Sequence, residues 1–136
     1  MITIKSKYLG DLRTECVHLQ SGNKIFTDAP TDNQGKGEAF SPTDLLAASL
    51  GTCIMTIMGI VARDNNIDIT GTELNITKIM ASDPRRVDEV VIEFNFPKKK
   101  YTAEEKQIIE NVAGTSPVPL SVHTQMTQTI KLNWPK

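Results

Sequence analysis

One uncharged stretch, Leu45 to Ala62, limits most strongly what this chain can fold into. Directly before it, Ser41, Pro42 and Asp44 form the pattern of a helix start, with a capping hydroxyl, a proline at the first helical position and an acid that completes a capping box. The apolar residues of the stretch surround the predicted helix instead of forming one stripe. A helix of this kind has to be covered on most of its sides.

The same stretch is nearly long enough for a membrane span, which takes about 20 apolar residues. Charged residues lie close to both ends of the stretch, and no basic segment beside it would set the orientation of a membrane span. Small and polar residues also interrupt the stretch, namely Ser49, Gly51, Thr52, Thr56 and Gly59. The sequence therefore favours a buried helix of a soluble protein, with no membrane partner.

Length and composition indicate one domain over residues 1–136, and the order of the expected strands and helices places it in the α+β class. The chain is 39% hydrophobic and 23% charged, with a formal net charge of -1. This near-neutral balance argues against nucleic acid or an anionic membrane as the main partner. The segment Met1 to Lys5 lacks the features of a signal peptide, so we expect a cytoplasmic protein whose two cysteines are reduced thiols.

Alternating apolar residues predict strands on either side of the central helix. A hairpin with a Gly-Asn turn is expected at residues 14–27, after a first strand at 1–8, and residues 28–38 are expected to form a loop. A second hairpin is expected at 74–96, followed by a helix that opens on the capping box at 102–105 and ends at Gly114, a short helix from 115–117, and a last strand at 126–134. This order predicts sheets packed on the central helix.

Three segments together resemble the OsmC/Ohr family of thiol-dependent organic hydroperoxide reductases. They are Gly-Asp-Leu-Arg at 10–13, Ser-Pro-Thr-Asp-Leu-Leu-Ala-Ala-Ser-Leu-Gly-Thr-Cys at 41–53, and Thr-Ser-Pro-Val at 115–118. The resemblance implies antiparallel sheets packed on a long buried helix. It also implies an intertwined homodimer with the cysteine-bearing helices at its core.

Cys53 matches the attacking cysteine of the family. Without the resemblance, a lone cysteine in an apolar helix would be read as a small buried hydrophobe. Attack requires a thiolate, and an apolar pocket alone disfavours one, so a cation has to be supplied. The resemblance assigns this role to Arg13, with Arg63 and Lys36 as the alternatives if Arg13 is only a surface charge.

Two positions depart from the family pattern. Peroxidase-type members carry an acid directly after the proline, which holds the arginine; here that place is Thr43, and the carboxylate comes one position later at Asp44. The capping box accounts fully for Asp44, so its part in the site stays open. The family's second cysteine falls on Ser116, and because a hydroxyl cannot form a disulfide, regeneration would need an external thiol or dithiol.

Two functions remain open from the sequence. The first is reduction of a small apolar organic hydroperoxide through Cys53; the second is a stress-associated protein without peroxidase turnover, which binds a small molecule or senses redox state through the same thiol. No cofactor or metal site is expected, because His18 and His123 form no close ligand pair with the cysteines. Cys16 is read as a strand residue without chemistry.

Overall fold

The computed structural model describes all residues, 1–136, as two compact units, Met1–Leu46 and Ala47–Lys136. The boundary between them falls within the central helix α1 (Pro42–Asp64).

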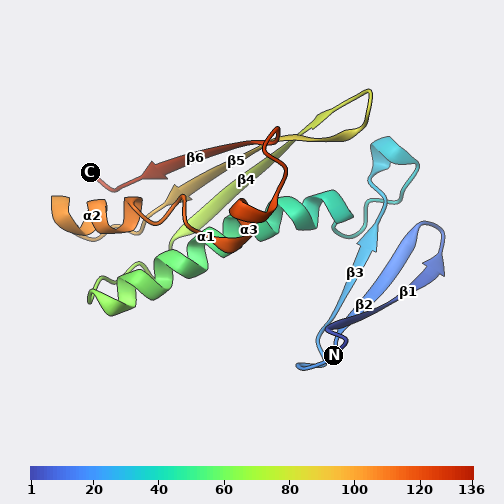
Figure 1. Ribbon diagram of the computed structural model, residues 1–136, viewed down its shortest axis with the longest axis horizontal. Coiled ribbons are helices and arrows are strands. Elements are labelled where there is room, and N and C mark those ends of the chain that lie inside the picture. Colours follow the sequence, from blue (N-terminus) through green and yellow to red (C-terminus); the bar gives the residue numbers. More distant parts are fainter. The chain divides into compact units, whose positions relative to one another are not determined.

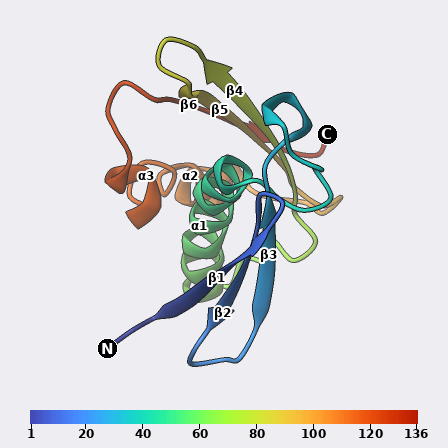
Figure 2. The same cartoon turned by 90° about the vertical axis from the view of Figure 1, so that its right-hand side faces the viewer.

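The first unit contains a three-stranded antiparallel sheet in the order β1-β2-β3 (Figure 2). Its strands are β1 (Ile4–Gly10), β2 (Arg13–His18) and β3 (Lys24–Asp28). The predicted hairpin is confirmed, with Val17 opposite Lys24, and Gly22 takes the positive φ of 76° that the connecting loop requires. The predicted loop after β3 contains a short 3₁₀ helix, η1 (Thr31–Asn33).

Helix α1 begins at the predicted residue. Ser41 Oγ accepts a hydrogen bond from the Asp44 amide at 3.0 Å, and Asp44 Oδ2 accepts one from the Ser41 amide at 3.0 Å. This reciprocal pair is the predicted capping box. The helix is long and apolar enough to cross a membrane by length and composition, but its buried residues belong to the core of the second unit.

Only one face of α1 is buried, although the sequence predicted cover on most sides. The buried positions recur at helical spacing: Ala47, Leu50, Gly51, Ile54, Met58 and Ala62. Thr52, Thr56 and Ile60 are exposed on the remaining surface. A single chain supplies one layer against the helix, and apolar side chains on the rest of its circumference are left partly or fully open.

The second unit is a three-stranded sheet with helices on one face (Figure 1). Its strands are β4 (Glu73–Ala81), β5 (Arg86–Asn95) and β6 (Thr127–Asn133), and the helices beside α1 are α2 (Ala103–Glu110) and α3 (Pro117–Ser121). Val90, Ile92 and Phe94 alternate along β5 and are completely buried. This face and the buried side of α1 form the hydrophobic core.

The predicted α+β class is confirmed, with one pairing that the sequence did not reveal. Strands β4 and β5 form the expected antiparallel hairpin, whereas β6 joins β5 in parallel, with Ile92 opposite Ile130. The long connection through α2 and α3 carries the chain back to the start of β5, which makes a parallel pairing possible. Helix α2 has the predicted capping box between Thr102 and Glu105, but it ends at Glu110 instead of Gly114.

Candidate functional site

Arg13 is positioned by a tight turn in the first unit. Asp11 and Leu12, which connect β1 to β2, both have positive φ angles of 50° and 62°. These values match the two-residue turns that suit the twist of a β-hairpin. Arg13 follows as the first residue of β2, directly opposite Asp28 at the end of β3.

Arg13 and Asp28 form a bidentate ion pair. Arg13 Nε donates to Asp28 Oδ1, and Nη2 donates to Oδ2, both at 2.7 Å. Nη2 also donates to Glu38 Oε2 at 2.9 Å. Hydrogen bonds from the guanidinium hold the pKa of Asp28 below its ordinary value, and the two carboxylates raise the pKa of Arg13. These contacts therefore favour the charged forms of both Arg13 and Asp28.

The loop after β3 folds back over Asp28. The Glu38 amide donates to Asp28 Oδ2 at 3.0 Å, and the Asp28 amide donates to the Phe40 carbonyl at 3.1 Å. Gly35 is required within this loop, because a Cβ at that position would lie 1.7 Å from the Ala29 carbonyl oxygen. The loop backbone and the Arg13 side chain thus converge on one buried carboxylate.

Asp44 has the structural part that its capping box predicted. Its carboxylate accepts from the Ser41 amide, and the Ser41 hydroxyl lies 3.0 Å from the Thr43 hydroxyl. The carboxylates that hold Arg13 in the described contacts are those of Asp28 and Glu38. A catalytic part for Asp44 stays a prediction.

Cys53 is a free, half-buried thiol about three turns from the start of α1. Thr56 lies one turn further along, and its hydroxyl donates to the Thr52 carbonyl at 2.8 Å. A hydroxyl has one proton, so Thr56 can present only lone pairs to its other neighbours. Stabilisation of a Cys53 thiolate therefore has to come from another group.

Ser116 is completely buried at the residue before α3. Its Oγ has no hydrogen-bond partner, although its backbone carbonyl accepts from the Leu120 amide at 3.3 Å. A buried hydroxyl without a partner costs about 1–3 kcal/mol. The Ser116 hydroxyl therefore adds no hydrogen bond that would stabilise the second unit.

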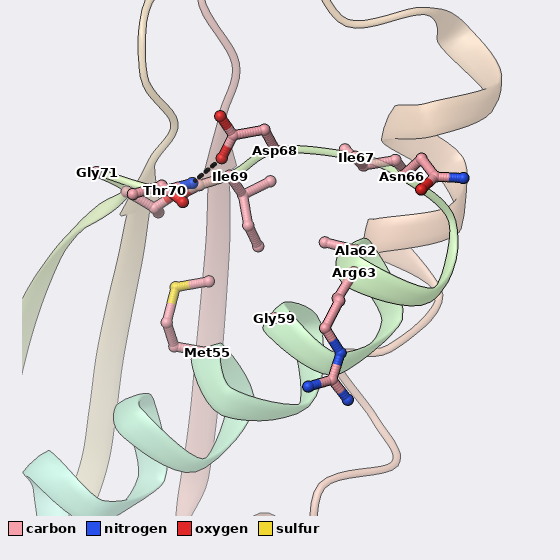
Figure 3. Close-up of a pocket in the computed structure, with 11 residues that line it drawn as sticks. Met55, Gly59, Ala62, Arg63, Asn66, Ile67, Asp68, Ile69, Thr70 and Gly71 are labelled. Atoms are coloured by element: carbon pink, nitrogen blue, oxygen red, sulfur yellow. Dashed lines mark hydrogen bonds between the residues drawn. The ribbon is translucent and has the colours of Figure 1, made fainter.

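An open pocket of about 650 Å³ lies between the C-terminal half of α1 and the segment after it (Figure 3). Met55 points from the helix toward Ile69, and Asp68 Oδ1 accepts from the Thr70 amide at 3.0 Å. Cys53 is not among its lining residues. This pocket is therefore not formed around the Cys53 thiol.

The remaining predicted residues do not join these sites. Cys16 accepts a hydrogen bond from the Ser6 hydroxyl on β1, and His18 pairs with the Ser21 hydroxyl next to the hairpin loop. No group of three or more His, Cys, Asp or Glu side chains is arranged to hold a metal ion. Arg13 belongs to the first unit and Cys53 to the second, so their meeting stays a prediction.

Asp28 and Glu38 were missed by reasoning from the sequence, where both fell in the loop between the hairpin and α1. Asp28 could have been found from the hairpin register. With Val17 opposite Lys24, an antiparallel ladder places Arg13 opposite Asp28, and opposite charges at such positions attract. Glu38 gives no comparable signal, because its position depends on the fold of the loop.

Comparison with known proteins agrees with this architecture. The OsmC-like protein family matches residues 35–131. A Psychrobacter arcticus protein, named for osmotic stress induction and a detoxification response, is 55% identical over 97% of this chain and 96% of its own, with a TM-score of 0.92. Comparison with curated proteins gives no match.

More distant structures share the fold. An organic hydroperoxide resistance protein OsmC from Legionella pneumophila is 16% identical over 100% of this chain and 98% of its own, with a TM-score of 0.72. One from Elizabethkingia anophelis is 19% identical over 100% and 97%, with a TM-score of 0.65. The fold and the helix that carries Cys53 thus define an OsmC/Ohr-type protein. The chain belongs to the OsmC-like family.

Proposed function

We propose that this protein reduces small apolar organic hydroperoxides through Cys53 and acts as a homodimer in the cytoplasm. The observation that carries the proposal is the free thiol of Cys53, half-buried on a helix that starts with the family's Ser-Pro-Thr-Asp motif. Half-burial shields a thiol from bulk water while leaving it reachable by a small molecule. The apolar side chains of α1 around it favour a substrate of low polarity.

The reaction starts with attack of the Cys53 thiolate on a peroxide oxygen. A sulfur–oxygen bond forms as the oxygen–oxygen bond breaks, which gives a sulfenic acid on Cys53 and an alkoxide that takes up a proton to leave as an alcohol. A first molecule of an external thiol then forms a mixed disulfide with Cys53 and releases water. A second thiol restores Cys53 and leaves as part of a disulfide.

Arg13 is proposed as the cation that favours the thiolate in the assembled protein. Its charge is permanent, and its side chain is 31% exposed, so part of the guanidinium is accessible. Arg13→Met should then move the pH midpoint of Cys53 alkylation by iodoacetamide upward. An unchanged midpoint would mean that the cation is another residue, with Arg63 and Lys36 as the candidates.

Ser116 determines how the proposed cycle ends. Because it provides no thiol, one equivalent of hydroperoxide should leave Cys53 as a sulfenic acid that dimedone traps, without an intrachain disulfide. In Ser116→Cys, the same treatment should consume two thiols per chain and abolish dimedone labelling. Continued labelling without a disulfide in that variant would show that residue 116 is not the resolving position.

The decisive test is peroxide consumption with a dithiol such as reduced lipoamide. Cys53→Ser should abolish turnover, because the attacking sulfur is gone. Cys16→Ser is the matched control, since Cys16 lies on β2 and has no assigned part in the reaction. Equal activity of the Cys53→Ser variant and the unmodified protein would overturn the proposal.

The serine at position 116 favours a second candidate function. A protein without a resolving thiol could bind a small molecule or sense redox state through Cys53 without repeated turnover. Under that alternative, dimedone would label Cys53 after one equivalent of hydroperoxide, but no dithiol would sustain consumption. Labelling is expected under both functions, so the lipoamide assay is the experiment that separates them.

A further inference from the structure

The three guanidinium nitrogens of Arg13 have unequal surroundings. Nε and Nη2 are both held by Asp28, and Nη2 is shared with Glu38. Nη1 has no hydrogen bond or ion pair within the chain. One edge of the guanidinium is therefore fixed, and the opposite nitrogen keeps its donors available.

Asp28 and Glu38 differ in how firmly they can hold this edge. The Asp28 side chain is 1% exposed, and the Glu38 side chain is 64% exposed. A buried carboxylate depends strongly on its partners, whereas an exposed ion pair contributes little. Asp28 is also fixed by the Glu38 amide, and both ends of the bidentate pair come from regular strands. Asp28 is thus the rigid anchor, and the carboxylate of Glu38 is an accessory.

We propose that Asp28 is the positioning residue for Arg13, holding its Nε–Nη2 edge so that Nη1 is the donor offered to the reacting sulfur or peroxide oxygen. This inference rests on the proposed function of Cys53 and Arg13. In the family that the sequence resembles, an acid directly after the proline holds the arginine, and this chain has Thr43 at that place. Here we assign the same part to Asp28, a strand residue. Asp44 caps α1.

Charge and positioning make opposite predictions for this anchor. The cluster of Arg13, Asp28 and Glu38 carries one positive and two negative charges, with Lys36 as a further cation that acts on Asp28. If Asp28 acted only through its charge, Asp28→Asn would make the region more positive and favour a thiolate. If Asp28 positions Arg13, the same variant frees the guanidinium and disfavours the thiolate.

The test measures the pH midpoint of alkylation in a Cys16→Ser background, so that only Cys53 reacts. Asp28→Asn should raise the midpoint by about as much as Arg13→Met, and the double variant should match Arg13→Met alone, because Asp28 acts through Arg13. Glu15→Gln is the matched control, since Glu15 is a β2 carboxylate paired across the sheet with Lys24 at 3.7 Å. It should leave the midpoint unchanged.

A second measurement reports the anchor without any activity. The Nε–H signal of Arg13 in nitrogen-15 NMR spectra should be protected from exchange in the unmodified protein and in Glu15→Gln, and should lose protection in Asp28→Asn. A thermal unfolding transition confirms that each variant is folded.

The outcomes separate this inference from the proposed function. If Arg13→Met raises the alkylation midpoint but Asp28→Asn lowers it or leaves it unchanged, the positioning role is wrong. The same holds if Arg13 Nε–H keeps its protection in Asp28→Asn. If the alkylation and NMR results are as expected but the protein consumes no hydroperoxide, the positioning role of Asp28 is supported and the proposed peroxidase function is wrong.

Discussion

The two sheets of this protein each have three strands, yet they differ in how their apolar side chains are covered. In the β4-β5-β6 sheet, Phe94 is completely buried against the helices of its own unit. In the β1-β2-β3 sheet, Phe26 is 46% exposed, and Ile4, Tyr8 and Ile25 are exposed as well. A sheet needs a packed apolar face to be stable on its own. Within one chain, the second sheet thus has a packed apolar face, whereas apolar side chains of the first sheet stay exposed.

The exposed apolar residues have a counterpart on α1. Ile60 is exposed on the helix surface, and the buried residues occupy only one side of the helix. In the first sheet, exposed apolar residues lie on both faces, because neighbouring residues of β3, Ile25 and Phe26, point to opposite sides. Exposed apolar surface of this kind is available for association. We therefore propose that a second copy of the chain covers both regions in the homodimer.

The largest expected effect comes from a matched pair of phenylalanine substitutions, one in each sheet. Phe94→Ala should lower the free energy of unfolding by about 3–5 kcal/mol, because it leaves a cavity in the core. Phe26→Ala should have a clearly smaller effect, because its side chain is 46% exposed within its own chain and its loss leaves no enclosed cavity there. Urea unfolding measures both, and equal losses at every concentration would remove the contrast between the sheets.

Assembly provides the next test. An obligate homodimer that covers the first sheet and α1 should bury more than about 2,000 Å². The unfolding midpoint should then rise with protein concentration, and Phe26→Lys should lower this dependence. Sedimentation equilibrium measures the mass directly. A stable, cooperatively unfolding monomer at micromolar concentration would contradict the homodimer.

The first sheet should also show a characteristic dependence on pH. The pKa of Asp28 is lowered in the folded protein, chiefly by hydrogen bonds from Arg13. Its stabilising contribution should therefore be complete above the ordinary carboxyl pKa of about 3.9 and be lost as the pH falls through the lower folded value. Thermal melting of the unmodified protein and Asp28→Asn from pH 6 down to pH 2 should show a difference in melting temperature that shrinks at the acid end. A constant difference would mean that the charge is not involved.

The smallest expected effect concerns the helix layer of the second sheet. Thr102→Ala removes the hydroxyl that accepts from the Glu105 amide at 3.1 Å, and should destabilise the protein by about 1 kcal/mol. Thr124→Ala changes the same residue type in an exposed turn and should be nearly neutral. Urea unfolding of the two variants makes the comparison. Equal effects would mean that the cap at α2 contributes nothing measurable.

Most elements were predictable from the sequence because their signals are local. The start of α1 at Pro42 follows from a capping box within four residues, and the β4–β5 hairpin follows from alternation around a turn. The parallel pairing of β6 was not predictable in this way. Alternation identifies a strand, but the direction of its neighbour depends on how the long connection folds.

The candidate site was predictable only in part, for a similar reason. Cys53 and Arg13 stand out in short motifs, whereas the anchor Asp28 depends on strand register, and the ion pair of Glu38 depends on the fold of a loop. No local pattern around Ser116 indicates that this residue is completely buried with an unpaired hydroxyl. That property arises from packing between segments distant along the chain.

The unpaired hydroxyl of Ser116 has a consequence for how this protein could change over generations. A serine differs from a cysteine by one atom, and a thiol loses less than a hydroxyl when it is taken out of water. Replacement by cysteine at this buried position would break no hydrogen bond, because the Ser116 side chain makes none. Exchange between serine and cysteine at position 116 should therefore change the free energy of unfolding little. A lineage could pass between one-thiol and two-thiol chemistry by single mutations, under selection on the reducing partner alone.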